Sequence, residues 1–388
     1  MTKSYLAHRV ATLKPSGIRK FFDIVATMKD VISLGIGEPD FTTPEPILQA
    51  GIRSLQRGET HYTSNAGILE LRQELAAHLQ RRYGVSYDPA KEVILTVGVS
   101  EALYLALTAI LEPGEEVLVP TPCFVAYQSE VILAGGVPVE IPSRVQDNFQ
   151  PNLAALEAAV TPRTKAILIG YPNNPTGAVA SRETLLEVLR IAEEHDLVVI
   201  SDEIYDRLVY GVPHVCFASL PGAWKRTITL GGFSKDYAMT GWRIGYAAGP
   251  ETLIQAMTNI QSQSTSNPTS ISQVAAEAAL TGDQGCMAPM LAAFRQRHRL
   301  VVDGLNAIPG LKCLDAGGAF YAFPDAREAA ARMQAKGRIQ EASDLALSEY
   351  LLLEAGVAVV PGSAFGADGY IRLSFATSNA NLENALAR

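Results

Sequence analysis

The sequence predicts an α/β protein of two domains, with a mostly parallel sheet wrapped by helices in the larger domain and a small second sheet in the other. From residue 91 to about 249, short β-rich apolar runs alternate with longer segments of helical periodicity. After Pro250 the chain changes to long alanine-rich amphipathic stretches, and alternating segments follow near its end. We place the large domain at 46–285 and build the small domain from 1–45 and 286–388.

The strands of the large domain are predicted from apolar runs that end in polar or turn residues. The runs are continuous rather than alternating, which is typical of strands that are buried on both faces. They span residues 93–97, 116–119, 165–169, 197–200 and 227–230, with a further run at 244–248.

The helices are predicted from apolar residues that recur on one face. Between two of the runs, residues 181–195 carry Leu185 and Leu189 on one face with charged residues opposite, and Ser181 is suited to cap the start. This segment is the expected crossover helix. The later helices are expected at 252–263, 270–280 and 290–305, the strands of the small sheet at 317–323 and 370–375, and a final amphipathic helix, which the chain does not complete, at 381–388.

Composition excludes several classes of protein. With 48% hydrophobic and 19% charged residues among 388, the chain can bury a sizeable core, so disorder is excluded as its main state. A net charge of −8 without a basic stripe argues against nucleic-acid binding, and no apolar run is long enough to cross a membrane. The four cysteines form no metal-binding or redox motif, which favours a reduced, cytoplasmic protein.

Polar strings follow the predicted strands at the points where the strands end. Ligands of open α/β sheets bind at these carboxyl ends, so the strings are candidates for a binding site. They are GVSEA at 98–102, GYPNNPTG at 170–177, SDEIY at 201–205, GGFSK at 231–235 and TGWR at 240–243. The first string is placed to open a helix and to direct free amides at an anion.

Each string also has an ordinary structural explanation. The NNPTG loop fits turn chemistry, Asp202 fits a helix cap, and Lys235 fits a solvated side chain. Arg372 fits an ion pair within a strand, and neither common phosphate-loop motif is present. The ordered combination of strings, rather than any one of them, favours a shared site.

Over nearly its whole length the sequence resembles the class I/II aminotransferases of fold type I, which depend on pyridoxal 5'-phosphate. The matching strings are GIGEPDF at 35–41, HYT at 61–63, YPNNPTG at 171–177, SDEIY at 201–205, FSK through MTGWR at 233–243, and YIRLS at 370–374. The resemblance implies a large domain with a mostly parallel seven-stranded sheet, a smaller α+β domain, and amino transfer between an L-amino acid and a 2-oxo acid.

The resemblance also implies roles around the ring of the cofactor. Lys235 matches the Schiff-base lysine, which burial would keep neutral, and Asp202 matches the carboxylate that keeps the ring nitrogen protonated. Tyr205 and Asn174 match the pair that hydrogen-bonds the ring 3'-oxygen. Phe124 and Ile204 match the residues that cover the two faces of the ring, although Phe124 also fits a core position.

For the phosphate, Arg243 matches the phosphate-binding arginine, with Ser234, Ser100 and the amides of Val99 and Ser100 completing an anion cradle at a helix start. Tyr62 matches a tyrosine that reaches the phosphate of the neighbouring subunit, which implies a homodimer with shared sites.

For the substrate, Arg372 matches the arginine that holds the α-carboxylate in a bidentate pair, and Gly37 would present its amide to the same group. Asn174 also belongs to this substrate site. Because these residues come from both predicted domains, substrate binding is expected to close the small domain onto the large one.

Three positions depart from the pattern of related enzymes. Some members have serine where this chain has Gly232, so Ser234 is expected to substitute as a phosphate ligand. Aspartate-selective members can have lysine in place of Ser100 and a Ser-Ala-Thr string in place of residues 16–18. A distal carboxylate would then lack one cation, which favours large apolar or aromatic donors with glutamate as partner.

Three functions compete at this point. The leading one is ping-pong transamination; aspartate selectivity is its variant. A C–S β-lyase would use the same lysine, aspartate and phosphate residues, because related chemistry can also expel a β-substituent. A cofactor-binding regulator would need a DNA-binding segment, and the N-terminal stretch is too short and insufficiently basic for one.

Overall fold

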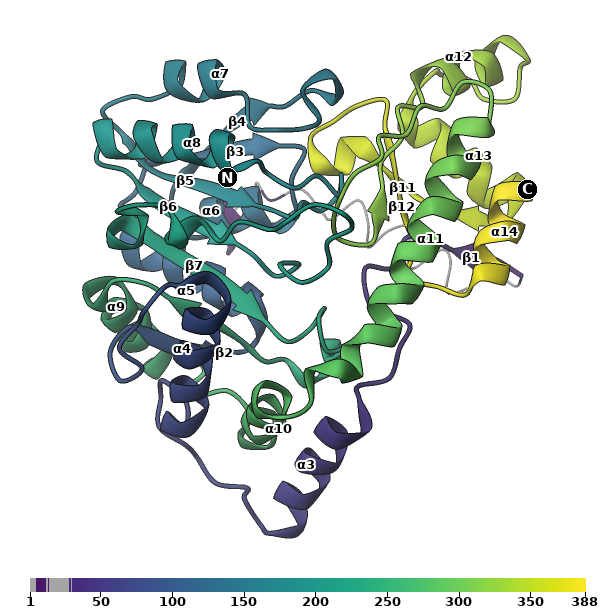
Figure 1. The fold of residues 1–388 in the computed structure, drawn as a ribbon. Helices are drawn as coiled ribbons and strands as arrows, with labels where there is room; N and C mark the ends of the chain where they lie inside the picture. The colour runs from purple at the N-terminus through teal and green to yellow at the C-terminus, as the bar shows by residue number, and fades with distance from the viewer. Residues whose placement is uncertain (1–4, 12, 14–27, 29) are drawn as a thin grey trace.

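A seven-stranded sheet forms the centre of the larger half of the protein, in a computed structural model that describes residues 5–11, 13, 28 and 30–388 (Figure 1). The strand order is β2-β8-β7-β6-β5-β3-β4, and every neighbouring pair is parallel except those that include β8. The strands are β2 Val93–Thr96, β3 Glu116–Thr121, β4 Val137–Pro142, β5 Thr164–Gly170, β6 Val198–Asp202, β7 Thr227–Gly232 and β8 Gly245–Ala248.

The predicted apolar runs are confirmed as strands, and the residues of these strands are buried on both faces of the sheet. In β2, Ile94 packs into one apolar cluster and its neighbour Leu95 into another on the opposite side of the sheet. The sequence analysis missed β4, which lies at the edge of the sheet and has only one buried residue, Ile141. Its two prolines suit an edge position, but they disguise it as a loop.

Helices cover both faces of this sheet, as the resemblance implies (Figure 1). The predicted crossover helix is α8, and the side chain of Ser181 caps it by accepting a hydrogen bond of 3.1 Å from the amide of Thr184. The helices of this half are α3 Glu45–Gln56, α4 Leu69–Tyr83, α5 Gly98–Ile110, α6 Ala126–Leu133, α7 Leu153–Ala158, α8 Arg182–Glu194, α9 Glu251–Ser262 and α10 Ser270–Thr281.

The smaller half contains two short sheets and the helices that pack on them (Figure 1). One sheet has the antiparallel order β11-β12-β9, and in the other β1 pairs in parallel with β10. The elements are β1 Ile32–Ser33, α11 Ala288–Ala307, β9 Tyr321–Ala322, α12 Arg327–Ala335, α13 Asp344–Ala355, β10 Val357–Ala358, β11 Val360–Pro361, β12 Ile371–Ser374 and α14 Asn379–Ala387; a short helix α1, His8–Ala11, lies near the N-terminus.

The strands predicted at 317–323 and 370–375 exist but are shorter than expected, as β9 and β12. Phe294 of α11 and Phe375 after β12 pack with Phe320 in the core of this half. The domain boundaries at residues 46 and 285 stay a prediction. No helix in the described ranges is both long and apolar enough to cross a membrane.

Register in the large sheet brings the predicted strings to one edge. Gly170 at the end of β5 lies opposite Asp202 at the end of β6, and Asp202 lies opposite Leu230 of β7. The residues that follow these three strands therefore leave the sheet side by side.

Candidate active site

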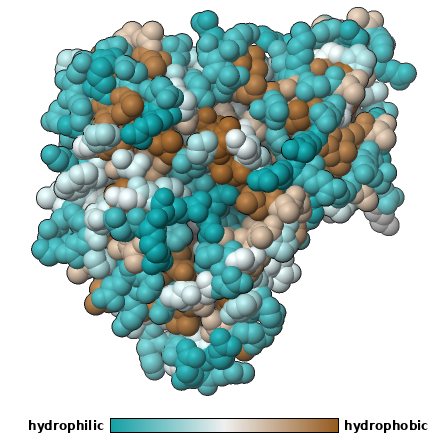
Figure 2. Space-filling model, viewed as in Figure 1, coloured by the Kyte–Doolittle hydropathy of each residue, from teal (hydrophilic) through white to brown (hydrophobic). Residues whose placement is uncertain are grey.

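All of the predicted site residues except Tyr62 line a single cavity of about 320 Å³ at this edge of the sheet. Hydrophobic residues gather in the middle of the face in Figure 2, between the half that holds the sheet and the half that holds α11 to α14. The predicted residues at the cavity are Gly37, Val99, Ser100, Phe124, Asn174, Asp202, Ile204, Tyr205, Ser234, Lys235, Arg243 and Arg372.

Asp202 is a buried carboxyl at the end of β6. The hydroxyl of Tyr127 donates a hydrogen bond of 2.7 Å to its Oδ2, and the amide of Ile204 donates one of 3.2 Å to its Oδ1. Burial raises the pKa of Asp202 to about 6, although both hydrogen bonds act against the rise. A cationic ring nitrogen beside Asp202 would favour its charged form, so this carboxyl is suited to hold a proton on such a nitrogen.

Lys235 follows β7 and is largely buried. Its Nζ donates a hydrogen bond of 2.6 Å to the carbonyl oxygen of Gly37, and it lies 5.9 Å from the ring centre of Tyr205 and 5.8 Å from that of Phe320. Burial is the main reason why the pKa of Lys235 falls from 10.5 to about 8. With this pKa, roughly a tenth of the amine is neutral at pH 7, and the neutral amine is the form that attacks an aldehyde.

The N-terminus of α5 and the guanidinium of Arg243 form an anion site. Gly98 has a φ of 73°, and a Cβ there would lie 2.6 Å from Nη2 of Arg243. Glycine therefore allows the guanidinium to approach the helix start. Val99, Ser100 and the buried Ser234 line the same end of the cavity.

Arg372 is 3% exposed and has no carboxylate partner among the described residues. Its Nη1 donates to Oδ1 of Asn174 at 3.0 Å and its Nη2 to the carbonyl oxygen of Gly35 at 2.5 Å, while Nε has no partner. Burial lowers the pKa of Arg372. Because the guanidinium of Arg372 is buried without an anionic partner, it is available to pair with the carboxylate of a ligand, which its planar shape matches.

The cavity fits the cofactor that the resemblance implies. It offers an amine at Lys235, a carboxyl at Asp202 and an anion cradle at Arg243, which match the aldehyde, the ring nitrogen and the phosphate of pyridoxal 5'-phosphate. Phe124 and Ile204 line the cavity, where the resemblance implies they cover the ring.

The contacts expected of Gly37 and Tyr62 are not seen within this chain. Gly37 uses its carbonyl to accept from Lys235, and the predicted contact of its amide with a carboxylate stays a prediction. Tyr62 is 90% exposed and does not line the cavity of its own chain. Residues 16–18, which entered the prediction of substrate selectivity, lie outside the described residues.

The sequence analysis did not assign several cavity-lining side chains to the site, among them Tyr127, Glu130 and Tyr321, besides Leu103, Pro172 and Thr240. Tyr127 and Glu130 lie in α6, three and six residues after Phe124, which precedes the helix, and this spacing could have pointed to Tyr127. Burial, followed by the charge of Asp202, raises the pKa of Glu130 to about 8. Tyr321 lies in a predicted strand, and alternation alone gives no sign of its contacts.

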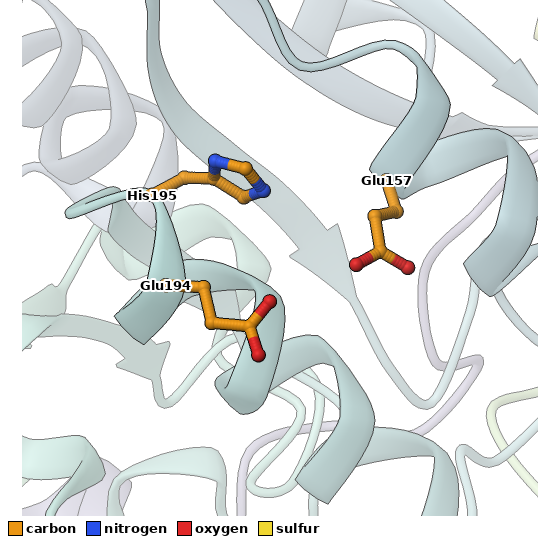
Figure 3. A group of neighbouring side chains, drawn as sticks. All are labelled: Glu157, Glu194 and His195. Carbon is orange, nitrogen blue, oxygen red and sulfur yellow. The ribbon is translucent and has the colours of Figure 1, made fainter.

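A second group of polar side chains lies away from this cavity. Glu157, Glu194 and His195 are exposed and close together (Figure 3). Arg190 already bonds both glutamates, at 3.2 Å and 2.7 Å. We therefore interpret this group as a surface ion-pair network.

Comparison with known proteins gives consistent matches. Residues 29–388 match the family model described as aminotransferase class I and II. The chain is 47% identical to the putative aminotransferase YugH of Bacillus subtilis and 46% identical to an aspartate aminotransferase of Geobacillus stearothermophilus; each match covers 99% of this chain and 97% of the relative. The crystal structure of an aromatic aminotransferase from Pyrococcus horikoshii superimposes with a TM-score of 0.87 and 42% identity, covering 95% of this chain and 96% of that one.

Proposed function

The chain belongs to the class I and II aminotransferases, which are transaminases with pyridoxal 5'-phosphate as cofactor, and on that premise we propose that it moves the amino group of an aromatic or large apolar L-amino acid, with glutamate and 2-oxoglutarate as the partner pair. The observation that carries the proposal is the presence of Lys235 and Arg372 in one cavity. One supplies an amine and the other binds a carboxylate, the two functions that an α-amino acid site needs.

When bound, pyridoxal 5'-phosphate supplies an aldehyde that condenses with amines and a ring that accepts the electron pair of the substrate Cα. Arg372 holds the α-carboxylate and thereby fixes the direction of the Cα–H bond. Lys235, as the neutral amine, accepts the proton from Cα. Asp202 holds a proton on the ring nitrogen, while Tyr205 and Asn174 donate to the 3'-oxygen.

Charge at the cavity supports the donor preference. Among the cavity-lining residues that the structure describes, the cations are Lys235, Arg243 and Arg372. Each of them has a role in the proposed reaction, so the described lining holds no further cation that favours an aspartate donor over an aromatic one, and the distal carboxylate of glutamate would have to extend beyond it. Phe124, Tyr127 and Tyr321 offer aromatic surface instead. The names of the relatives include both aspartate and aromatic aminotransferases, so selectivity for aspartate is the competing assignment.

A single-turnover experiment tests both the reaction and the donor. The holoenzyme is mixed without acceptor with phenylalanine, tyrosine, aspartate, glutamate, alanine and cysteine in turn, and the 2-oxo acid formed is measured. One equivalent from the aromatic donors, formed faster than from aspartate, agrees with the proposal. A faster reaction with aspartate would move the assignment to the aspartate-selective variant.

The same experiment separates transamination from C–S lyase activity. A lyase releases ammonia and pyruvate from cysteine continuously without an acceptor, whereas a transaminase stops after one equivalent. Continuous release with no amino transfer from the other donors would therefore replace the proposed function by β-elimination.

We also propose that the protein acts as a cytoplasmic homodimer with shared sites. Its four cysteines are free, which suits a reducing compartment. Tyr62 is exposed in its own chain, as expected for a residue that serves a neighbouring subunit.

Subunit mixing tests the shared site. A Lys235→Ala subunit keeps Tyr62, and a Tyr62→Phe subunit keeps Lys235, so a mixed dimer would contain one complete site. Activity above the sum of the separate variants supports sharing, and no gain from mixed dimers isolated by differential tags contradicts it.

A further inference from the structure

Tyr321 connects the two parts of the cavity that the proposed reaction uses. It lies in β9, is 2% exposed, and contacts both Tyr205 and Arg372. Its hydroxyl lies close to Gly37, where a Cβ would be 2.5 Å from the tyrosine oxygen. The side chain is therefore fixed between three residues that the prediction placed around the cofactor and the substrate.

The ring of Tyr321 supports the guanidinium of Arg372. The Cζ atom of Arg372 lies 4.6 Å from the ring centre of Tyr321 and 4.9 Å from that of Phe365. Aromatic surfaces favour a cation above their faces, and contacts with two rings restrict the tilt of the guanidinium. Since Nε has no hydrogen-bond partner, these rings supply orientation that hydrogen bonds do not.

The hydroxyl of Tyr321 supports Tyr205. The two hydroxyl oxygens lie 2.8 Å apart, and the rings meet edge to face at 5.9 Å between centres. Tyr205 has one hydroxyl hydrogen. If it donates that hydrogen to the 3'-oxygen of the cofactor, its own oxygen becomes the acceptor for Tyr321, and the two bonds strengthen each other.

We propose that Tyr321 is a positioning residue with two separable functions, in which its ring orients Arg372 for the substrate carboxylate and its hydroxyl orients Tyr205 for the cofactor. The proposal rests on the proposed function and adds a residue to it. Substrate and cofactor sites then communicate through one side chain.

The charge of Arg372 determines how substrate binding affects the hydrogen bond between Tyr321 and Tyr205. A cation against the Tyr321 ring makes its hydroxyl a better donor; burial raises the pKa of Tyr321, and Arg372 acts in the opposite sense. A substrate carboxylate that pairs with Arg372 offsets this charge. The hydrogen bond from Tyr321 to Tyr205 therefore weakens when substrate arrives.

Two substitutions separate the functions. Tyr321→Phe removes the hydroxyl and keeps the ring, while Tyr321→Leu removes both. Tyr171→Phe is the matched control, because the hydroxyl of Tyr171 donates a hydrogen bond of 2.9 Å to the carbonyl oxygen of Phe149, and Tyr171 does not line the cavity.

Three readouts are used with each holoenzyme. They are the dissociation constant of pyridoxal 5'-phosphate, the pH titration of the visible cofactor band, and the inhibition constant of 3-phenylpropanoate, a carboxylate without an amino group. The groups that face Tyr321 and influence the titration are Tyr205 and Arg372, with Lys235 and Asp202 farther along the cavity.

For Tyr321→Phe we expect cofactor affinity to fall about fivefold to tenfold and the titration midpoint to rise, as the loss of one hydrogen bond predicts. The inhibition constant should stay within about twofold of wild type, because the ring is retained. For Tyr321→Leu we expect the inhibition constant to rise about tenfold in addition.

Wild-type cofactor affinity and titration in Tyr321→Phe, as in Tyr171→Phe, would overturn the function of the hydroxyl. A wild-type inhibition constant in Tyr321→Leu would overturn that of the ring. If Tyr321→Leu does not fold, Tyr321→Met replaces it, since its flexible side chain fills the space without a ring. A failure of the proposed function would appear instead as absent amino transfer in the wild-type enzyme.

Discussion

Replacing Lys235 by methionine should stabilise the cofactor-free protein, because the amine is held where its charged form is disfavoured. A fall of the pKa from 10.5 to about 8 corresponds to about 3 kcal/mol against the ammonium in the folded state at pH 7. Methionine removes this cost of the buried ammonium and also the hydrogen bond to Gly37, which is worth about 1 kcal/mol. The expected net gain is about 2 kcal/mol at pH 7.

The pH dependence has a defined sign. Between the folded pKa of about 8 and the unfolded pKa of 10.5, the unfolded chain binds a proton that the folded chain does not, so wild-type stability rises with pH. The advantage of Lys235→Met should therefore shrink across this window and be lost above it.

Urea unfolding of the cofactor-free proteins measures this effect, since bound cofactor would stabilise the wild type separately. Lys225→Met is the control, because Lys225 is exposed. A Lys235→Met protein that unfolds at lower urea than wild type at pH 7, or that keeps its full advantage at pH 11, would refute the reasoning.

Three further changes test other parts of the site and core. Asp202→Asn should lower kcat by about a hundredfold or more and leave KM less affected, as steady-state kinetics would show; an unchanged kcat would remove Asp202 from the reaction. Arg372→Lys should raise KM at least about tenfold without displacing cofactor, because lysine cannot form the bidentate pair, and unchanged kinetics would point to another carboxylate anchor. Burial disfavours the charged ring of His214, but its 2.8 Å contact with buried Glu203 outweighs this and raises the pKa of His214 above 6.5. Its stabilisation is thus complete below pH 6.5 and lost as pH rises through the raised pKa, so His214→Gln should cost about 3 kcal/mol in urea unfolding at pH 6 and less at pH 9; an equal cost at both would contradict the charged pair.

The strands of the large sheet could be predicted because burial on both faces produces continuous apolar runs, as in β5 and β6. The polar strings that follow these strands could be recognised as one candidate site, because parallel strands bring their carboxyl ends to one edge of the sheet. The edge strand β4, which is buried at only one residue, gave no such pattern.

Residues that act through contacts with distant segments could not be predicted in the same way. Tyr127 reaches Asp202 across 75 residues of chain, and Tyr321 reaches Tyr205 across 116. An aromatic residue in a helix or strand has the same local pattern whether it fills a core or supports a site. Tertiary packing alone distinguishes the two.

One short main-chain segment bonds two of the three cations among the described residues of the cavity, since the carbonyl of Gly35 accepts from Arg372 and that of Gly37 from Lys235. Under the proposed roles, a substrate carboxylate at Arg372 would replace the bond to Gly35, and attachment of the cofactor to Lys235 would replace the bond to Gly37. Residues 35–37 therefore compete with both ligands, because each ligand would exchange a hydrogen bond that the protein already makes.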